Sequence, residues 1–503
     1  MTIQNLPGTE MLYTAAQTRE LDRCAIEDYG IPGIVLMARA AAATFDALLG
    51  VWPDTGCVHV LCGTGNNGGD GYLVADLAHK RGMAVCVYQL GDVGKIKGDA
   101  LRAKEQALAN GVAVKAFNPG DFKVADGDLV VDAMLGTGLG GDVRGPYAQA
   151  IATVNASGLP VLAVDIPSGL CSDTGRVLGA AICAAVTVTF IGLKRGLFTG
   201  EAPDYTGAIH FTDLAVPVEV YQQAPCACAK LELEPLLARL PPRPAASHKG
   251  SYGSVLIVGG DEGMAGAVAM AAEAALRCGV GLVRVATHVE HVPAIVARTP
   301  EAMAHGVRNG AELIPLIAQS DVLVVGPGLG QSPWSEQLLH AALASGKAVV
   351  LDADALNLLS AGRAALSARD NCLLTPHPGE AARLLGCTTA QIQADRFAAA
   401  QQLQKMVGGV VVLKGNGSLI AGAGQLLLSD YGNPGMASGG MGDVLSGVLG
   451  ALLAQASAHH MTALECAALG VCLHGAAADR AARDGQRGLC ATDLMPHLRE
   501  LLA

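Results

Sequence analysis

The sequence predicts a two-domain α/β protein, with a doubly wound sheet in the first half and a further α/β domain in the second. Its 503 residues exceed the size, about 250–300 residues, at which a single hydrophobic core stops growing. Apolar runs of strand length alternate with helix-like stretches, a pattern typical of parallel sheets covered by helices. The chain holds 64 glycines and is 51% hydrophobic but only 4% aromatic, which suits helices packed closely on sheets.

Six apolar runs in the first half are predicted to be strands. Several are continuous and rich in β-forming residues, as expected for parallel strands that are buried on both faces. The predicted strands are residues 58–62, 84–90, 129–133, 160–165, 185–190 and 208–212. Helices are predicted between them, for example over residues 72–81 and 100–110. The pattern indicates a Rossmann-like doubly wound sheet.

The α/β pattern resumes after a proline-rich segment without strand signals, residues 223–246, which is predicted to join the domains. The two domains are therefore expected to span residues 1–222 and 247–503. The strands predicted in the second domain are residues 254–258, 281–286, 322–325, 348–352, 372–375 and 410–414, followed by a hairpin of 419–421 with 425–429.

Charge and composition exclude several classes of protein. The net charge of −11 and the scattered basic residues argue against a nucleic-acid partner. The N-terminus lacks a basic and an apolar signal region, and the longest uncharged run, residues 444–464, contains polar residues that favour a buried helix followed by a loop. These features predict no attachment to a membrane. The 14 cysteines lack the spacing of a disulfide framework, so we expect free thiols in a reducing cytoplasm.

A glycine-rich loop follows the first predicted strand. Gly63, Gly65 and Gly68 match the G-x-G-x-x-G pattern, in which backbone N–H groups and a helix N-terminus face a phosphate. Asp92 follows the next strand at about the spacing of a ribose-binding acid. A Rossmann dehydrogenase is therefore one interpretation of this half.

The polar residues within the same loop argue against that interpretation. Asn66, Asn67 and Asp70 stand where a pyrophosphate needs bare backbone, and a carboxylate would repel it. Amides with a carboxylate indicate a site that hydrogen-bonds a polar ligand. For Asp70, capping of the following helix is an equal alternative.

Two further predicted strands end in polar, glycine-containing loops. Asp132 ends one strand and precedes the glycine loop 136–142, while Asp165 and Ser168 follow the next strand. Ligands of doubly wound sheets bind beyond the carboxyl ends of strands, so these loops are predicted to form one site. Oxygen atoms of Asn67, Asp132 and Ser168 suit an alkali or alkaline-earth cation.

A second site is predicted where three glycines precede an apolar helix in the second half. Amide groups of Gly439, Gly440 and Gly442 would form a receptacle for a phosphoryl group, and the adjacent Asp443 would accept a proton from an attacking hydroxyl. The alternative is that Asp443 only complements the dipole of the helix, worth less than ~1 kcal/mol.

The motifs of the first half resemble the N-terminal module of the NAD(P)H-hydrate epimerase family. They are GTGNNGGDG (63–71), VDAMLGTGL (131–139) and VDIPSG (164–169). The resemblance implies that potassium binds Asn67, Asp132 and Ser168, and that Asp165 with Lys194 transfers the proton at the epimerised carbon. It also implies a set of residues that bind the hydrated cofactor: Asn66, Asn67, Gly68, Gly69, Asp70, Gly136, Thr137, Gly138, Leu139, Gly140, Gly141, Asp142 and Asp165.

The second half resembles the ribokinase-like superfamily and, more narrowly, the NAD(P)H-hydrate dehydratase family. The motifs that carry this resemblance, in order, are SHKGSYG, GGDEGMAGA, GPGLG, LDADALN, LTPHPGE, KGNGS and NPGMASGGMGDVLSG. The resemblance implies that Ala267, Gly330, His377 and Asp443 contact the hydrated cofactor. It implies nucleotide binding by Lys414, Gly415, Asn416, Gly417, Ser418 and Gly442, and an anion hole of Gly439, Gly440 and Gly442. Asp352 and Asp354 are metal candidates, although Asp354 is equally a helix cap.

The two resemblances together imply a nicotinamide-cofactor repair enzyme. The first domain would interconvert the R and S hydrates, NADHX and NADPHX, and the second would dehydrate the S epimer with conversion of ADP to AMP and phosphate. Magnesium is expected with ADP, and ATP stays open as the donor. A homo-oligomer is expected from the resemblance.

Two other interpretations are compatible with the same residues. A small-molecule kinase of the vitamin or sugar type would use the same glycines and Asp443, but KGNGS and LTPHPGE together argue against it. Alternatively, the first half could bind a cofactor as a sensor or interaction module without catalysis.

Overall fold

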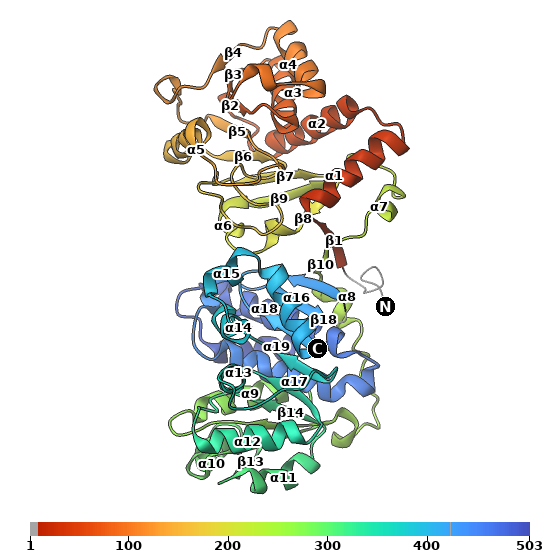
Figure 1. The fold of residues 1–503 in the computed structure, drawn as a ribbon, viewed down its shortest axis with the longest axis vertical. Coiled ribbons are helices and arrows are strands. Elements are labelled where there is room, and N and C mark those ends of the chain that lie inside the picture. The colour runs from red at the N-terminus through yellow and green to blue at the C-terminus, as the bar shows by residue number, and fades with distance from the viewer. Residues whose placement is uncertain (1–8, 423) are drawn as a thin grey trace. The chain divides into compact units, whose positions relative to one another are not determined.

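The computed structural model describes residues 9–422 and 424–503, which divide into two compact units (Figure 1). The N-terminal unit comprises Met11–Ala227, drawn in red to yellow-green. The C-terminal unit comprises Cys228–Ala503 together with residues 9–10, and its main part is drawn in green to blue.

The N-terminal unit contains a seven-stranded parallel sheet in the order β4-β3-β2-β5-β6-β7-β9. Its strands are β2 (Cys57–Cys62), β3 (Ala84–Gln89), β4 (Val114–Ala116), β5 (Leu129–Ala133), β6 (Val161–Val164), β7 (Val186–Phe190) and β9 (Ala208–Thr212). The strand order reverses between β2 and β5, the point at which doubly wound folds bind ligands. A short parallel pair, β1 (Thr9–Tyr13) with β8 (Leu193–Lys194), does not belong to this sheet.

Helices cover both faces of this sheet, as expected for a doubly wound fold. Val58 and Val60 point into a core with one group of helices, whereas Leu61 and Val130 point into a second core against α5. The helices are α1 (Ala15–Arg23), α2 (Gly33–Val51), α3 (Asn66–Lys80), α4 (Gly98–Ala109), α5 (Gly145–Ser157), α6 (Pro203–Thr206) and α7 (Val220–Gln223). Successive strand residues face opposite sides of the sheet, and both sides are covered by helices. The strands are therefore continuous apolar runs in the sequence.

The C-terminal unit is built on a larger mixed sheet. Its order is β13-β12-β11-β14-β15-β16-β17-β18-β19-β10, parallel except where β18 runs antiparallel to β17 and β19. The strands are β10 (Cys228–Leu231), β11 (Ser254–Val258), β12 (Leu282–Thr287), β13 (Met303–Gly306), β14 (Val322–Val325), β15 (Ala348–Leu351), β16 (Cys372–Leu374), β17 (Val410–Leu413), β18 (Ser418–Gly422) and β19 (Gln425–Ser429).

Alternating strand residues again point into two helical layers. Val255 and Val324 belong to the core formed with α9, α17 and α18, while their neighbours Leu256 and Leu323 are equally buried on the other face. The helices are α8 (Leu233–Leu237), α9 (Ala265–Arg277), α10 (Val292–Arg298), α11 (Gly310–Ala318), α12 (Pro333–Ala344), α13 (Ala353–Ser360), α14 (Pro378–Leu385), α15 (Thr389–Ala394), α16 (Arg396–Val407), α17 (Met441–His459), α18 (Ala463–Ala481) and α19 (Leu494–Leu501).

Two helices, α2 and α17, are long and apolar enough to cross a membrane by length and composition alone. Most of the apolar stretch of α17, 61%, is buried inside the protein, as expected for a core helix. The prediction for the run 444–464, a buried helix followed by a loop, is therefore confirmed, and the helix extends from Met441 to His459.

Several local expectations were wrong. The helix predicted to begin at residue 72 begins at Asn66, so most of the glycine-rich loop is helical. The segment 223–246 was expected to lack strands, yet it contains β10 and α8, because a short apolar run pairs with β19 regardless of the surrounding prolines. The three-residue β4 and the edge strand β13 were also missed. All 14 cysteines are free, although Cys183 is exposed rather than buried.

A close helix contact in the C-terminal unit generates a stability prediction. A Cβ atom on Gly447 of α17 would lie 2.1 Å from the carbonyl oxygen of Ala271 in α9, so no side chain fits there. We expect Gly447→Ala to lower the free energy of unfolding by about 1–3 kcal/mol through overpacking.

Gly266→Ala is the matched control, because a Cβ atom there meets nothing within 4 Å and its φ is not positive. This helical substitution should be neutral or stabilising by up to ~1 kcal/mol. Urea unfolding of both variants measures the difference, and equal midpoints would contradict the packing account.

Candidate active sites

The loops at the carboxyl ends of β2 and β5 pack against one another without space for side chains. A Cβ atom on Gly63 would lie 1.8 Å from the carbonyl oxygen of Met134, and one on Gly68 would lie 2.2 Å from the oxygen of Gly63. The N-cap of α3 is Gly65, with no side-chain cap, so capping by Asp70 is excluded. The glycines of this motif therefore allow close approach between the two strand ends.

Asn67 is placed on that junction with its amide unsatisfied. Both polar atoms of its side chain are buried and have no hydrogen-bond partner. A Cβ atom on Gly136 would lie 3.4 Å from the Cβ of Asn67, so Asn67 lies against the loop that follows Asp132. Because buried amides are nearly always hydrogen-bonded, these atoms indicate a ligand position.

Asp132 and Ser168 are brought into direct contact at neighbouring strand ends. The Ser168 hydroxyl donates to Asp132 Oδ1 at 2.6 Å, and the Ser168 N–H donates to Oδ2 at 2.7 Å. These hydrogen bonds lower the pKa of Asp132, but burial outweighs them and raises it to about 6. In the described parts of the chain no lysine or arginine pairs with Asp132, so its carboxylate with the Asn67 amide fits a hard cation.

A buried ion pair lies at the end of β6. Lys194 is 1% exposed and donates to Asp165 Oδ1, to Thr189 Oγ1 at 2.9 Å and to the Phe190 oxygen at 3.0 Å. Asp165 has a φ of 68°, in the left-handed region, and its side chain is 17% exposed. Such backbone strain at a partly exposed carboxylate is typical of functional positions.

Two further carboxylates share the field of Lys194. Burial, followed by the charges of Asp165 and Asp22, raises the pKa of Asp70 well above its usual range, while Lys194 opposes the shift. Burial likewise raises the pKa of Asp22 to about 6, and Asp165 adds to the shift. The Lys194 ammonium is thus a shared counter-ion of the carboxylates of Asp165, Asp70 and Asp22. Sequence reasoning missed Asp22, because a single acid in the amphipathic α1 carries no motif.

The loop 136–142, predicted to contact the ligand, is largely exposed. Cβ atoms on Gly138, Gly140 and Gly141 would meet nothing within 4 Å. Asp142 is half-exposed and pairs with Arg144 at 3.7 Å. The loop is therefore open around these three glycines.

The second site is built where α17 begins. Gly440 adopts a φ of 93° and is the N-cap of α17, so the chain turns sharply into the helix. A Cβ atom on Gly442 would lie 3.4 Å from both Asp352 Oδ2 and Lys414 Nζ, so the first turn faces that pair. The structure thereby brings together Gly442, Asp352 and Lys414 at the helix N-terminus, where an anion is stabilised.

Lys414 and Asp352 form an ion pair at 2.8 Å in which the side chain of Asp352 is 2% and that of Lys414 21% exposed, and Glu380 lies 3.9 Å from the ammonium. Burial alone would lower the pKa of Lys414, but Asp352 and Glu380 outweigh it and raise that pKa. Burial alone would raise the pKa of Asp352, but Lys414 and the Ser446 hydroxyl, 2.7 Å away, hold it below its usual range. Both partners therefore stay charged.

Asp443 lies in the first turn of α17 with a strongly shifted pKa. Burial and the nearby Asp352 carboxylate raise it to about 7, although Lys414 opposes the shift. A carboxyl group that titrates near neutrality beside an anion site is suited to general base catalysis. This favours the catalytic interpretation of Asp443 over a purely helical one.

Three predicted contact residues lie on separate segments of the C-terminal unit. The N–H of Gly330 donates to Asp354 Oδ2 at 2.9 Å, so Asp354 anchors a loop and does not cap α13. His377 is half-exposed and caps α14 by accepting from the Gly379 N–H at 3.0 Å. Ala267 lies in the first turn of α9, close to Gly328.

The predicted nucleotide loop 414–418 is supported by a buried arginine. Arg396 is 2% exposed and donates to the carbonyl oxygens of Leu413, Lys414 and Gly417. A Cβ atom on Gly415, whose φ is 143°, would lie 2.5 Å from this guanidinium. Sequence reasoning missed Arg396, which lies outside the recognised motifs.

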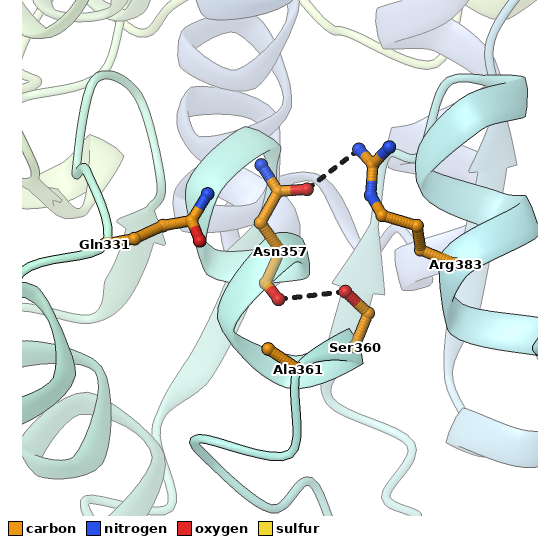
Figure 2. Close-up of a pocket in the computed structure, with 5 residues that line it drawn as sticks. All are labelled: Gln331, Asn357, Ser360, Ala361 and Arg383. Carbon is orange, nitrogen blue, oxygen red and sulfur yellow. Dashed lines mark hydrogen bonds between the residues drawn. The ribbon is translucent and has the colours of Figure 1, made fainter.

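A pocket of about 510 Å³ adjoins the Gly330 loop (Figure 2). Its lining residues, none of which was predicted, are Gln331, Asn357, Ser360, Ala361 and Arg383. Arg383 donates to Asn357 Oδ1 at 2.8 Å, as Figure 2 shows, and the Asn357 amide donates to Asp354 Oδ1 at 3.2 Å. Hydrogen bonds thus link the pocket through Asp354 to Gly330.

Fold and sites together define a two-domain α/β enzyme whose C-terminal site is of the phosphoryl-transfer type. A family model described as NAD(P)H-hydrate dehydratase matches residues 255–500, and one described as YjeF-related protein N-terminus matches residues 33–196. The chain belongs to the family of bifunctional NAD(P)H-hydrate repair enzymes, which confirms the resemblance of both halves.

Relatives extend over the whole chain. It is 47% identical to the bifunctional NAD(P)H-hydrate repair enzyme of Coxiella burnetii over 98% of this chain and 99% of that one. It is 43% identical to the enzyme of that name from Escherichia coli over 99% of this chain and 95% of the relative. A ribokinase-like superfamily protein from Enterococcus faecalis superposes with a TM-score of 0.50 at 32% identity, covering 54% of this chain and 94% of that one.

The shared ammonium of the first site generates a stability prediction. Lys194→Met leaves Asp165, Asp22 and Asp70 without a counter-ion. We therefore expect the free energy of unfolding to fall by about 3 kcal/mol at alkaline pH. The loss should shrink as the pH falls below about 6, because protonation of the carboxyls removes their repulsion.

Urea unfolding followed by Trp52 fluorescence in a Trp334→Phe background reports on the N-terminal unit. Lys80→Met is the control, because that lysine pairs with Asp76 but is 51% exposed and should contribute less than ~1 kcal/mol. A Lys194→Met variant as stable as the control at every pH would refute the shared counter-ion.

Proposed function

We propose that residues 1–222 epimerise the R and S hydrates of NADH and NADPH, and that residues 247–503 dehydrate the S epimer with conversion of ADP to AMP and phosphate. Residues 223–246 join the two activities. The observation that carries the proposal is Asp443, whose pKa near 7 accompanies a helix N-terminus and the buried Lys414.

Dehydration requires activation of a poor leaving group. In our proposal, Asp443 accepts the proton of the substrate hydroxyl. The hydroxyl oxygen attacks the terminal phosphorus of ADP at the same time, and AMP is released. Amides of Gly439, Gly440 and Gly442 and the N-terminus of α17 stabilise the phosphoryl charge. The ring nitrogen then expels phosphate, and loss of a ring proton restores the double bond.

The nucleotide is assigned to the loop 414–418 and Gly442. Lys414 supplies a fixed positive charge, and Arg396 holds the loop through its carbonyl oxygens. Magnesium is proposed to arrive with ADP, because the Asp352 carboxylate is already bound by Lys414 and Ser446. ATP stays open as an alternative donor, since the contacts described for this loop do not distinguish two phosphates from three.

The hydrated cofactor is assigned to Ala267, Gly330, His377 and Asp443. In this assignment the nicotinamide ring lies against Asp443 in the first turn of α17. The pocket with Arg383 adjoins the Gly330 loop and offers room for a more distant part of the dinucleotide.

Epimerisation is assigned to the first site. Asp165 is the partly exposed member of the ion pair with Lys194, so it can reach the substrate while the lysine holds its charge. Substrate is proposed to lie against residues 66–70 and the open loop 136–142. Asp22, whose pKa burial raises to about 6, can exchange protons near neutral pH, and burial also raises the pKa of Asp70 well above its usual range.

Potassium is proposed to bind Asn67, Asp132 and Ser168. The unpartnered amide of Asn67 and the unpaired buried carboxylate of Asp132 support this assignment. The cation would supply positive charge beside the substrate, and the three side chains would orient it. A cytoplasmic location is proposed from the 14 free thiols, and a homo-oligomer from the family resemblance.

Asp443→Asn tests the dehydratase assignment. We expect dehydration of the S hydrate to fall about 10²–10⁴-fold, with epimerisation unchanged, because only the general base is lost. In the wild type the rate should rise with pH and level off above about 7, since the protonated carboxyl cannot accept a proton.

NADH absorbance measures the rate, and the exposed Asp484→Asn is the matched control. Near-normal turnover of Asp443→Asn, or a wild-type rate that is flat between pH 5 and pH 9, would overturn the assignment of the base.

Exchange of monovalent cations tests the potassium assignment. Replacing potassium by tetramethylammonium at constant ionic strength should slow epimerisation at least about tenfold, leaving dehydration of pure S hydrate unchanged. Potassium should also raise the melting temperature of the N-terminal unit by mass action. Asp132→Asn should abolish both responses; responses that persist in that variant would place the cation elsewhere.

A further inference from the structure

Two cysteines and a histidine meet on one face of the N-terminal sheet, away from the residues assigned to epimerisation. Cys57 pairs in register with Ala84, and His59 pairs with Cys86, so Cys57, His59 and Cys86 point to the same face of β2 and β3. One potential ligand atom from each lies within 4.8 Å of the others. Cys57 is the first residue of β2, whereas the epimerase site follows the strand's last residue.

The histidine of this cluster is oriented by a carboxylate. His59 Nε2 lies 3.0 Å from Asp128 Oδ2, which also accepts from the Ala125 N–H at 2.8 Å. Asp128 Oδ1 accepts from the Cys57 N–H at 2.8 Å. Both carboxylate oxygens of Asp128 thus accept from backbone N–H groups, and a carboxylate that accepts from Nε2 as well leaves the ring hydrogen on Nε2.

That tautomer leaves His59 Nδ1 with a lone pair. The Tyr88 hydroxyl lies 3.2 Å from Nδ1 and donates a hydrogen bond to this lone pair. A metal-binding histidine usually donates its other ring N–H to a carboxylate, which fixes the ring and raises its basicity. The His59–Asp128 pair has this arrangement.

We propose that Cys57, Cys86 and His59 Nδ1 bind a thiophilic divalent cation, with Zn²⁺ as the best match, and that Asp128 orients His59. Two sulfurs and an imidazole are ligands that zinc prefers, whereas magnesium and potassium prefer oxygen. Zinc bond lengths place tetrahedral ligand atoms roughly 3.5–4 Å apart, so small side-chain rotations close the cluster.

Binding is chemically balanced without any redox partner. Each thiol releases its proton to solvent, the two thiolates neutralise the dication, and the Tyr88 hydroxyl gives up its bond to Nδ1. Cys57 and Cys86 are partly exposed, which allows the ion to enter and leaves the fourth position to water. The site would fasten β2 to β3 at the opposite end of β2 from the epimerase site, so its role is structural.

Cobalt binding to the full-length, reduced, metal-free chain tests the proposal. We expect one Co²⁺ per chain with thiolate-to-cobalt absorption that Zn²⁺ displaces. Cys57→Ser and Cys86→Ser should each weaken binding at least about tenfold, and the exposed Cys183→Ser should bind like the wild type. Absence of thiolate absorption, or its survival in both variants, would overturn the site.

Alkylation of the unmodified chain provides a second readout if a variant fails to fold. Zn²⁺ should slow iodoacetamide labelling of Cys57 and Cys86 at least about tenfold, with no effect on Cys183, as mapped by peptide mass spectrometry. Equal labelling of Cys57 and Cys86 with and without Zn²⁺ would refute the proposal. A Cys57–Cys86 disulfide that forms in air despite Zn²⁺ would assign the pair to redox chemistry instead.

Discussion

The burial of a lysine ammonium among carboxylates is the constraint on which both sites depend. A buried ammonium needs a counter-ion, and Lys194 and Lys414 each have an aspartate at a strand end, Asp165 and Asp352. Lys194 lowers the pKa values of Asp70 and Asp22 against the effect of burial, and Lys414 does the same for Asp443. The arrangement therefore leaves surplus carboxyls in both units.

The surplus carboxyls explain how both sites can carry out proton transfer near neutral pH. Once one aspartate has paired with the lysine, burial and like charge raise the pKa of the remaining acids. The pKa of Asp22 in α1 reaches about 6 and that of Asp443 in α17 reaches about 7 in this way. The paired aspartate keeps the lysine charged, and the unpaired acids become available as acids and bases.

The sequence predicted the strand ends well, because buried parallel strands leave continuous apolar runs and their polar loops stand out. Asp132 and Asp165 were placed at strand ends for that reason, whereas the glycines before α17 were singled out because an apolar helix follows them. The pairing of Lys414 with Asp352 could not be read from the sequence, because 62 residues separate them and only the fold brings them together. Asp22 and Arg396 were missed because each is one charged residue in a helix without a motif.

Local propensity failed where tertiary contacts override it. Asparagine and glycine disfavour helix, yet α3 begins at Asn66, because the glycines let its first turn approach β5 closely. In the same way, β10 forms within a proline-rich segment because β19 supplies its hydrogen bonds. Both departures concern segments whose conformation is set by a distant neighbour.

The most direct test of the central claim, that one chain carries both activities, is the recovery of NADH from a mixture of its R and S hydrates. Purified full-length protein is added with ADP, magnesium and potassium, and NADH absorbance is followed to completion. Recovery of both epimers is predicted. Recovery that stops at the S fraction would contradict the epimerase assignment, and no recovery with either ADP or ATP would contradict the dehydratase and return the small-molecule kinase as the better account.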